Sequence, residues 1–97
     1  MLIQIKKILP AKLRRLGLEK AVEFEKMRHD WDGILSAAVD PAWQKKSRPL
    51  KIKNEVLLVH CLNSVWANEL QMKERIILEK IRKAFRNIVV ERIKFIS

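Results

Sequence analysis

The sequence has a single cysteine, two glycines and no tyrosine. The one thiol, Cys61, cannot form a disulfide within the chain, which is typical of proteins from a reducing cytoplasm. Gly17 and Gly33 are too few to build a glycine-rich phosphate loop, and the motifs G-x-x-x-x-G-K-[ST], G-x-G-x-x-G and G-x-S-x-G do not occur. These absences exclude the enzyme classes that depend on such motifs.

Long apolar runs are also missing. No run approaches the ~18 residues of a membrane-spanning helix. At the N-terminus, the stretch from Leu2 to Leu9 is interrupted by Gln4, Lys6 and Lys7, so it lacks the apolar core of a signal peptide. We therefore expect a soluble, cytoplasmic protein with no membrane partner.

Candidate catalytic and metal-binding residues are few. His29, Asp30 and Asp32 would be spread over most of the solvent side of a helix, and no second group of ligands completes a site. His60 and Cys61 are neighbours on a predicted strand, so they point to opposite faces and cannot form a nucleophile–base pair. We expect no enzyme activity, no metal, no cofactor and no small-molecule substrate.

What the sequence does have is positive charge. It contains 21 Lys and Arg against 11 Asp and Glu, a formal net charge of +10, and the excess is +5 in residues 1–50 and +5 in residues 51–97. A balance of this kind favours a polyanionic partner, first of all nucleic acid, with an acidic protein surface or an anionic membrane as lesser options. The alternative is a basic but inert surface.

The 97 residues suit one domain, because compact domains usually have ~50–200 residues. We divide the chain into a basic amphipathic segment, residues 1–17, and one domain, residues 18–97. Pro10 splits the N-terminal segment. That segment either packs along the core or is free to bind a partner.

The hydrophobic pattern predicts the elements of the domain. A helical period runs from Leu18 to about Val39, and a second long helix begins at Asn63 or Ser64, either of which can cap it. A first strand is predicted at Pro49–Lys53. A second strand follows the turn Asn54-Glu55, and a third is predicted at Ile88–Ile96. Two helices on one face of a three-stranded sheet give an α+β layer sandwich.

The alternation within the strands predicts which side chains face the core. We expect Ile52 opposite Leu57 and Leu50 opposite Val59 on the inner face. In the third strand, Val89 is expected to point inward. Ile93 and Phe95 are expected on the same side as Val89, and the aromatic residues Phe24, Trp31 and Trp66 are also assigned to the core.

The other sheet face should be basic. It would present the side chains of Lys51, Lys53, His60, Arg92 and Lys94, with Val56 and Leu58 among them. Phosphates are attracted by such a face. The alternative is a solvated face shielded by long side chains.

Five cations within nine residues make the first patch of predicted nucleic-acid-binding residues, and two on the last strand extend it. The full set is Lys45, Lys46, Arg48, Lys51, Lys53, Arg92 and Lys94. Trp43, in the loop beside this patch, either stacks on a base, inserts into a protein partner or covers the end of the core. Candidate partner-binding residues are therefore Trp43 and the N-terminal cations Lys6, Lys7, Arg14 and Arg15.

One further pattern resembles a known family. It comprises Trp31-Asp-Gly-Ile-Leu, Pro41, Leu50-x-Ile52, Leu57-x-Val59-x-Cys61, Ser64-x-Trp66-Ala67-x-x-Leu70 and Arg92-Ile93-x-Phe95. Over about residues 20–97 this is similar to the DciA-type bacterial helicase-loader family. The resemblance implies a KH-like domain of the α-β-β-α-β kind (type II-like) that binds the replicative DnaB-type helicase and DNA, without catalytic activity.

True KH domains hold four nucleotides with a G-x-x-G loop, which is absent here. The leading hypothesis is a non-enzymatic DNA-replication accessory protein that assists helicase loading. The alternatives are a KH-like RNA-binding module that is ribosome- or RNA-associated, and a basic protein-interaction module that meets an acidic partner.

Overall fold

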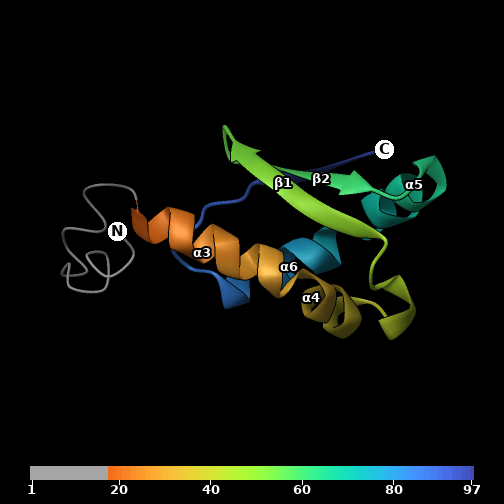
Figure 1. Cartoon of the computed structure of the whole chain (residues 1–97), viewed down its shortest axis with the longest axis horizontal. Helices are drawn as coiled ribbons and strands as arrows, with labels where there is room; N and C mark the ends of the chain where they lie inside the picture. Colours follow the sequence, from red (N-terminus) through yellow and green to blue (C-terminus); the bar gives the residue numbers. More distant parts are fainter. Residues whose placement is uncertain (1–17) are drawn as a thin grey trace.

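The computed structural model describes residues 18–97 (Figure 1), so the segment predicted at residues 1–17 lies outside the described residues. The helices and strands follow one another in the order that the sequence predicts, but each long helix is divided in two. The elements are α3 (Leu18–His29), α4 (Trp31–Ala38), the short 3-10 helix η1 (Pro41–Trp43), β1 (Ser47–Lys53), β2 (Val56–Cys61), α5 (Ser64–Met72), α6 (Glu74–Ala84) and β3 (Arg92–Ile96).

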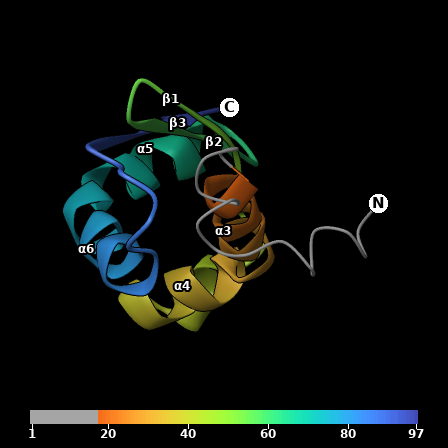
Figure 2. The same ribbon diagram turned by 90° about the vertical axis from the view of Figure 1, so that its left-hand side faces the viewer.

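The strands form one sheet in the order β1-β2-β3, in which β1 and β2 are antiparallel and β2 and β3 are parallel. Figure 1 and Figure 2 show the four α-helices on the same side of this sheet. α5 and α6 pack against β3, α3 contacts β1, and α4 packs on α6. The predicted α+β class is confirmed, and the arrangement is consistent with a small α+β KH-like fold.

The hydrophobic core lies between the inner sheet face and the helices. Trp31 is its largest side chain and is 2% exposed, and its indole N–H donates to Ser47 Oγ (3.0 Å). This hydrogen bond fixes the start of β1 relative to α4. The other buried apolar residues are Met27, Ile34, Leu35, Leu57, Val59, Cys61, Leu70, Ile77, Leu78, Ile81, Phe85, Ile88, Val90, Ile93 and Phe95.

The predicted helix from Leu18 to Val39 bends at Asp30, whose φ and ψ are −93° and 6°. Hydrogen bonding continues through the bend, because the Asp30 N–H donates to Lys26 O and its carbonyl accepts from the Ile34 N–H. Aspartate has a low helix propensity because its side chain competes for backbone groups. The bend turns α4 onto α6 and keeps Trp31 and Ile34 in the core.

The second long helix begins as predicted. The Asn63 side chain accepts a hydrogen bond from the Trp66 N–H (3.0 Å), which confirms Asn63 as the N-cap. The helix is divided at Lys73, with φ and ψ of −103° and 13°. This division places the end of α5 and the start of α6 beside β3.

The β1–β2 hairpin has the predicted turn, with φ values of 52° at Asn54 and 65° at Glu55. Positive φ at both central residues is typical of a type I′ turn, whose twist matches that of the strands. Ile52 pairs with Leu57 as predicted.

The prediction that Leu50 faces Val59 is wrong, because the register shifts between Pro49 and Lys51. Pro49 pairs with Val59 and is fully buried, whereas Leu50 is the extra residue of a β-bulge and is 38% exposed. Strict alternation could not predict this shift.

The third strand is shorter than predicted, and Val89 does not face the core. Val89 is 54% exposed, while Ile88 and Val90 are buried. β3 begins at Arg92, opposite Val56, so any earlier residue would face the hairpin turn rather than a strand. Residues 88–91 therefore have no strand partner, and their burial alternates out of phase with that of β3, in which Ile93 and Phe95 are buried.

Candidate nucleic-acid interface

The register of the three strands brings nine side chains together on the face that the described helices leave uncovered. We call this surface the basic face. Its three cross-strand rows are Arg48–His60–Ile96, Lys51–Leu58–Lys94 and Lys53–Val56–Arg92. Two columns of mainly cationic residues, on β1 and β3, thus flank a central column on β2.

The bulge at Leu50 decides the orientation of Arg48. In a regular hairpin with Ile52 opposite Leu57, Arg48 would share the inner face with Leu50 and Ile52. The extra residue reverses the alternation before Lys51, so Arg48 pairs with His60 on the outer face. Bulges commonly re-aim side chains in this way. As a result, the sheet gains a third β1 cation beside Lys51 and Lys53.

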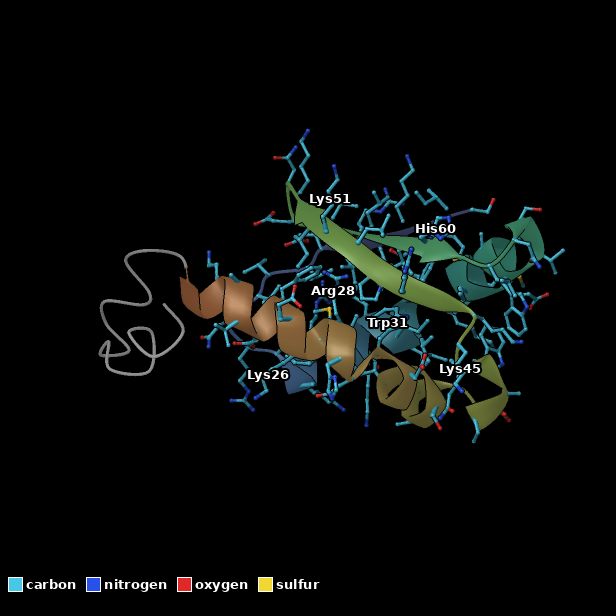
Figure 3. All side chains as sticks on the ribbon, viewed as in Figure 1. Lys26, Arg28, Trp31, Lys45, Lys51 and His60 are labelled. Carbon is cyan, nitrogen blue, oxygen red and sulfur yellow. The ribbon has the colours of Figure 1, made fainter. Side chains whose placement is uncertain are left out.

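The cations of the basic face are exposed and free of acidic partners. Among the described side chains, those of residues 20–97, the ion pair Arg28–Glu25 (3.2 Å), on α3, is the one present, and none involves Arg48, Lys51, Lys53, Arg92 or Lys94. Figure 3 shows Lys51 and His60 on the sheet, with Trp31 between sheet and helices. These side chains therefore offer unneutralised positive charge to an anion.

The edge of the sheet at β3 is closed by two helical side chains. The N–H groups of Ile93 and Phe95 donate to Glu74 Oε2 (2.9 Å) and Gln71 Oε1 (3.2 Å), and the carbonyl of Ile93 accepts from Gln71 Nε2 (3.0 Å). A strand edge with satisfied backbone groups does not recruit another strand. The sequence pattern gave no signal for this clamp, because it depends on contacts 19 to 24 residues apart.

The edge at β1 is blunted differently. Pro49 has no N–H to donate, and the bulge at Leu50 interrupts the regular edge. With both edges unfavourable for strand addition, the sheet presents its face rather than its edge as a binding surface.

Two of the seven predicted nucleic-acid-binding residues lie elsewhere than on these three rows. Lys45 has a φ of 60°, its N–H donates to Asp32 Oδ1 (2.9 Å), and it lies beside η1 in Figure 3. Lys46 is half-buried, and its Nζ lies 5.4 Å from the centre of the Trp66 ring.

Trp43 packs against Trp66, with ring centroids 5.2 Å apart and an angle of 79° between the ring planes. Both indoles are half-buried, so Trp66 is less enclosed than the sequence suggested. A helical wheel could not reveal this pairing, because it joins η1 to α5. The other predicted partner-binding residues, Lys6, Lys7, Arg14 and Arg15, lie outside the described residues.

Other reactive groups do not assemble into a site. Cys61 is 1% exposed, and burial raises the pKa of its thiol to about 11. Within residues 18–97 no group of three or more His, Cys, Asp or Glu side chains is arranged to hold a metal ion. The helices in this range are too short or too polar to cross a membrane.

The family model for "Dna[CI] antecedent, DciA" matches residues 4–95, which is nearly the whole chain. The chain belongs to the DciA family. This family has a role in loading the replicative helicase and is not a family of enzymes. Neither the curated proteins nor the solved structures include a match to this chain. The match to the family model confirms the resemblance inferred from the tryptophan and strand motifs.

Proposed function

We propose that this protein is a cytoplasmic, non-enzymatic accessory factor of DNA replication that binds the replicative DnaB-type helicase and DNA and assists helicase loading. Membership of the DciA family supports the loading role. The observation that supports DNA binding is the basic face, where five exposed cations without acidic partners lie on one uncovered surface.

On this face the phosphate backbone is the natural ligand. Lys and Arg side chains attract phosphates without regard to sequence, and each contact releases counterions. The central column contributes Val56, Leu58 and His60, so the three rows contain no Trp, Tyr or Phe ring for a base to stack on. Binding on the basic face should therefore be independent of sequence and strongly dependent on salt.

A comparison of two charge-matched variants tests this proposal. The first replaces Lys51, Lys53, Arg92 and Lys94 by Gln. The second replaces four exposed cations on the helical side, Lys26, Lys80, Lys83 and Arg86, by Gln, so that the net charge falls equally. Fluorescence anisotropy with a labelled DNA strand should show a large loss of affinity for the first variant and a small loss for the second. Equal losses would show that net charge, and not the basic face, determines binding.

The same assay separates DNA from RNA binding. Affinities for single-stranded DNA, duplex DNA and RNA are compared at one fixed salt concentration, because the affinity of a protein for nucleic acid falls steeply as salt concentration rises. A strong preference for RNA would contradict the replication role and favour an RNA-associated KH-like protein.

Helicase binding is tested by size-exclusion chromatography with light scattering, using the purified chain and the replicative helicase of the same organism without nucleic acid. A complex of defined stoichiometry supports the loading role. Failure of two folded proteins to co-elute would contradict direct contact. Lys6, Lys7, Arg14 and Arg15 remain predicted contact residues for this partner, and Trp43 is a candidate contact for either the helicase or DNA.

A further inference from the structure

The basic face continues beyond its three rows toward the start of β1. The Leu62 N–H donates to the Lys46 carbonyl (2.8 Å), one step beyond the Ser47–Cys61 pair. Lys46 and Leu62 lie in the bends immediately before β1 and after β2, so this hydrogen bond extends the hairpin one step beyond the strands. Leu62 is 64% exposed. A chain of phosphates that follows β1 therefore reaches Lys46 after Arg48.

Beyond Lys46 stand two indole rings. Lys46 Nζ lies over the ring of Trp66, and Trp66 meets Trp43 nearly at right angles. The contacts of Trp66 with both neighbours hold it in place. Trp43 lies in η1, is partly exposed and also packs against the core. An aromatic ring thus stands where the β1 line of cations ends.

The loop that positions Trp43 is fixed by its own hydrogen bonds. The Trp43 N–H donates to Asp40 O (3.0 Å), and the Ala42 N–H donates to Asp40 Oδ1 (2.8 Å). Asp32 accepts from the Lys45 N–H. The carboxylates of Asp40 and Asp32 are therefore engaged by backbone N–H groups of this loop, and the ring is held before any ligand arrives.

We propose that Trp43 is a stacking subsite for an unpaired base of a single strand whose phosphates lie along the β1 side of the basic face. This inference rests on the proposed DNA binding and adds a preference for single strands. Cations alone attract both single and double strands, whereas a partly exposed ring stacks on a base that is not enclosed in a duplex. Insertion of Trp43 into a protein partner is the alternative that the test must separate.

The test uses two labelled single strands of equal length, one of mixed sequence and one that is abasic over its whole length. Both have the same phosphates, but only the first has bases. Replacing Trp43 by Leu should weaken binding of the intact strand at least about fivefold, the lower end for loss of one stacked base. Binding of the abasic strand should not change. Trp43→Phe, which keeps an aromatic face, should retain most of the affinity.

Intrinsic fluorescence gives a second measurement. Trp31 is 2% exposed, so quenching of the wild-type protein by the intact strand must come chiefly from Trp43 and Trp66. Trp43→Phe should remove much of this quenching while it preserves binding. Thermal unfolding of each variant shows whether the domain remains folded.

Two results would overturn the stacking subsite. Equal losses of affinity for intact and abasic strands would show that Trp43 only supports the loop. Unchanged binding of both strands would show that the ring does not touch nucleic acid, and loss of helicase co-elution in the same variant would then assign it to the protein partner. The variant at Lys51, Lys53, Arg92 and Lys94 separates these results from failure of the proposed function, because it should lose both strands if the basic face binds phosphates.

Discussion

Glu74 holds the outer edge of β3, and its removal should destabilise the domain. Glu74 Oε2 accepts from the N–H of Ile93, whose residue is 1% exposed, and Glu74 Oε1 accepts from Gln71 Nε2. In Glu74→Ala the Ile93 N–H loses its acceptor, and the Gln71 side chain loses one of its three hydrogen bonds. An unsatisfied buried N–H costs about 1–3 kcal/mol. The melting temperature should fall by roughly 4 °C or more, because each kcal/mol corresponds to about 4–8 °C in a domain of this size.

Urea unfolding followed by circular dichroism measures this loss. The midpoint should decrease with an unchanged m-value, since the surface exposed on unfolding stays the same. Glu79→Ala is the matched control, because Glu79 lies on the same helix and is exposed. Its effect should stay within about 0.5 kcal/mol. If Glu74→Ala unfolds at the same urea concentration as the control, the clamp does not stabilise β3 and the reasoning is refuted.

Three further substitutions test the local structure by the same urea assay. Asn63→Ala should cost about 1 kcal/mol by loss of the N-cap, whereas Asn63→Asp should retain most of the stability; equal costs would argue against the cap. Leu50→Thr should cost less than about 1 kcal/mol because Leu50 is in the bulge and partly exposed, whereas Leu57→Ala in the core should cost about 2–5 kcal/mol, and the reverse order would contradict the register. For Cys61, the ordinary pKa of 9.0 applies to the unfolded chain and about 11 to the folded one, so the folded state binds more protons and stability should decline as pH rises from 9 to 11. Cys61→Ala should lack this part of the decline, and an identical pH profile would contradict the burial of the thiol.

Features that depend on neighbouring residues were predictable. The turn at Asn54-Glu55, the cap at Asn63 and the pairing of Ile52 with Leu57 follow from local residue types and from period-2 alternation. The bulge at Leu50 was not predictable, because a single extra residue leaves the pattern of Leu50, Ile52 and the lysines apparently regular. The place of Val89 was missed for a related reason: the end of a strand depends on where its partner strand begins.

In the candidate site, too, features that depend on residues near in sequence were predictable, and contacts between distant elements were not. Alternation along single strands was enough to group Lys51, Lys53, Arg92 and Lys94 on one face, and the structure brings them together. The contact of Lys46 with Trp66 joins a loop to a helix 20 positions later, and no periodicity encodes such a contact. The local sequence pattern therefore predicts the basic face itself, whereas the contact of Lys46 with Trp66 beyond its edge depends on tertiary packing.

The salt dependence of DNA binding tests the central claim most directly. For single strands, each phosphate contact contributes about −0.7 to the slope of log K against log salt concentration. Replacing Lys51, Lys53, Arg92 and Lys94 by Gln should therefore flatten the slope by about 3 units if each makes one contact. The variant at Lys26, Lys80, Lys83 and Arg86 should keep nearly the wild-type slope. If the two variants have the same slope, or if the first keeps that of the wild type, the basic face is not the nucleic-acid interface.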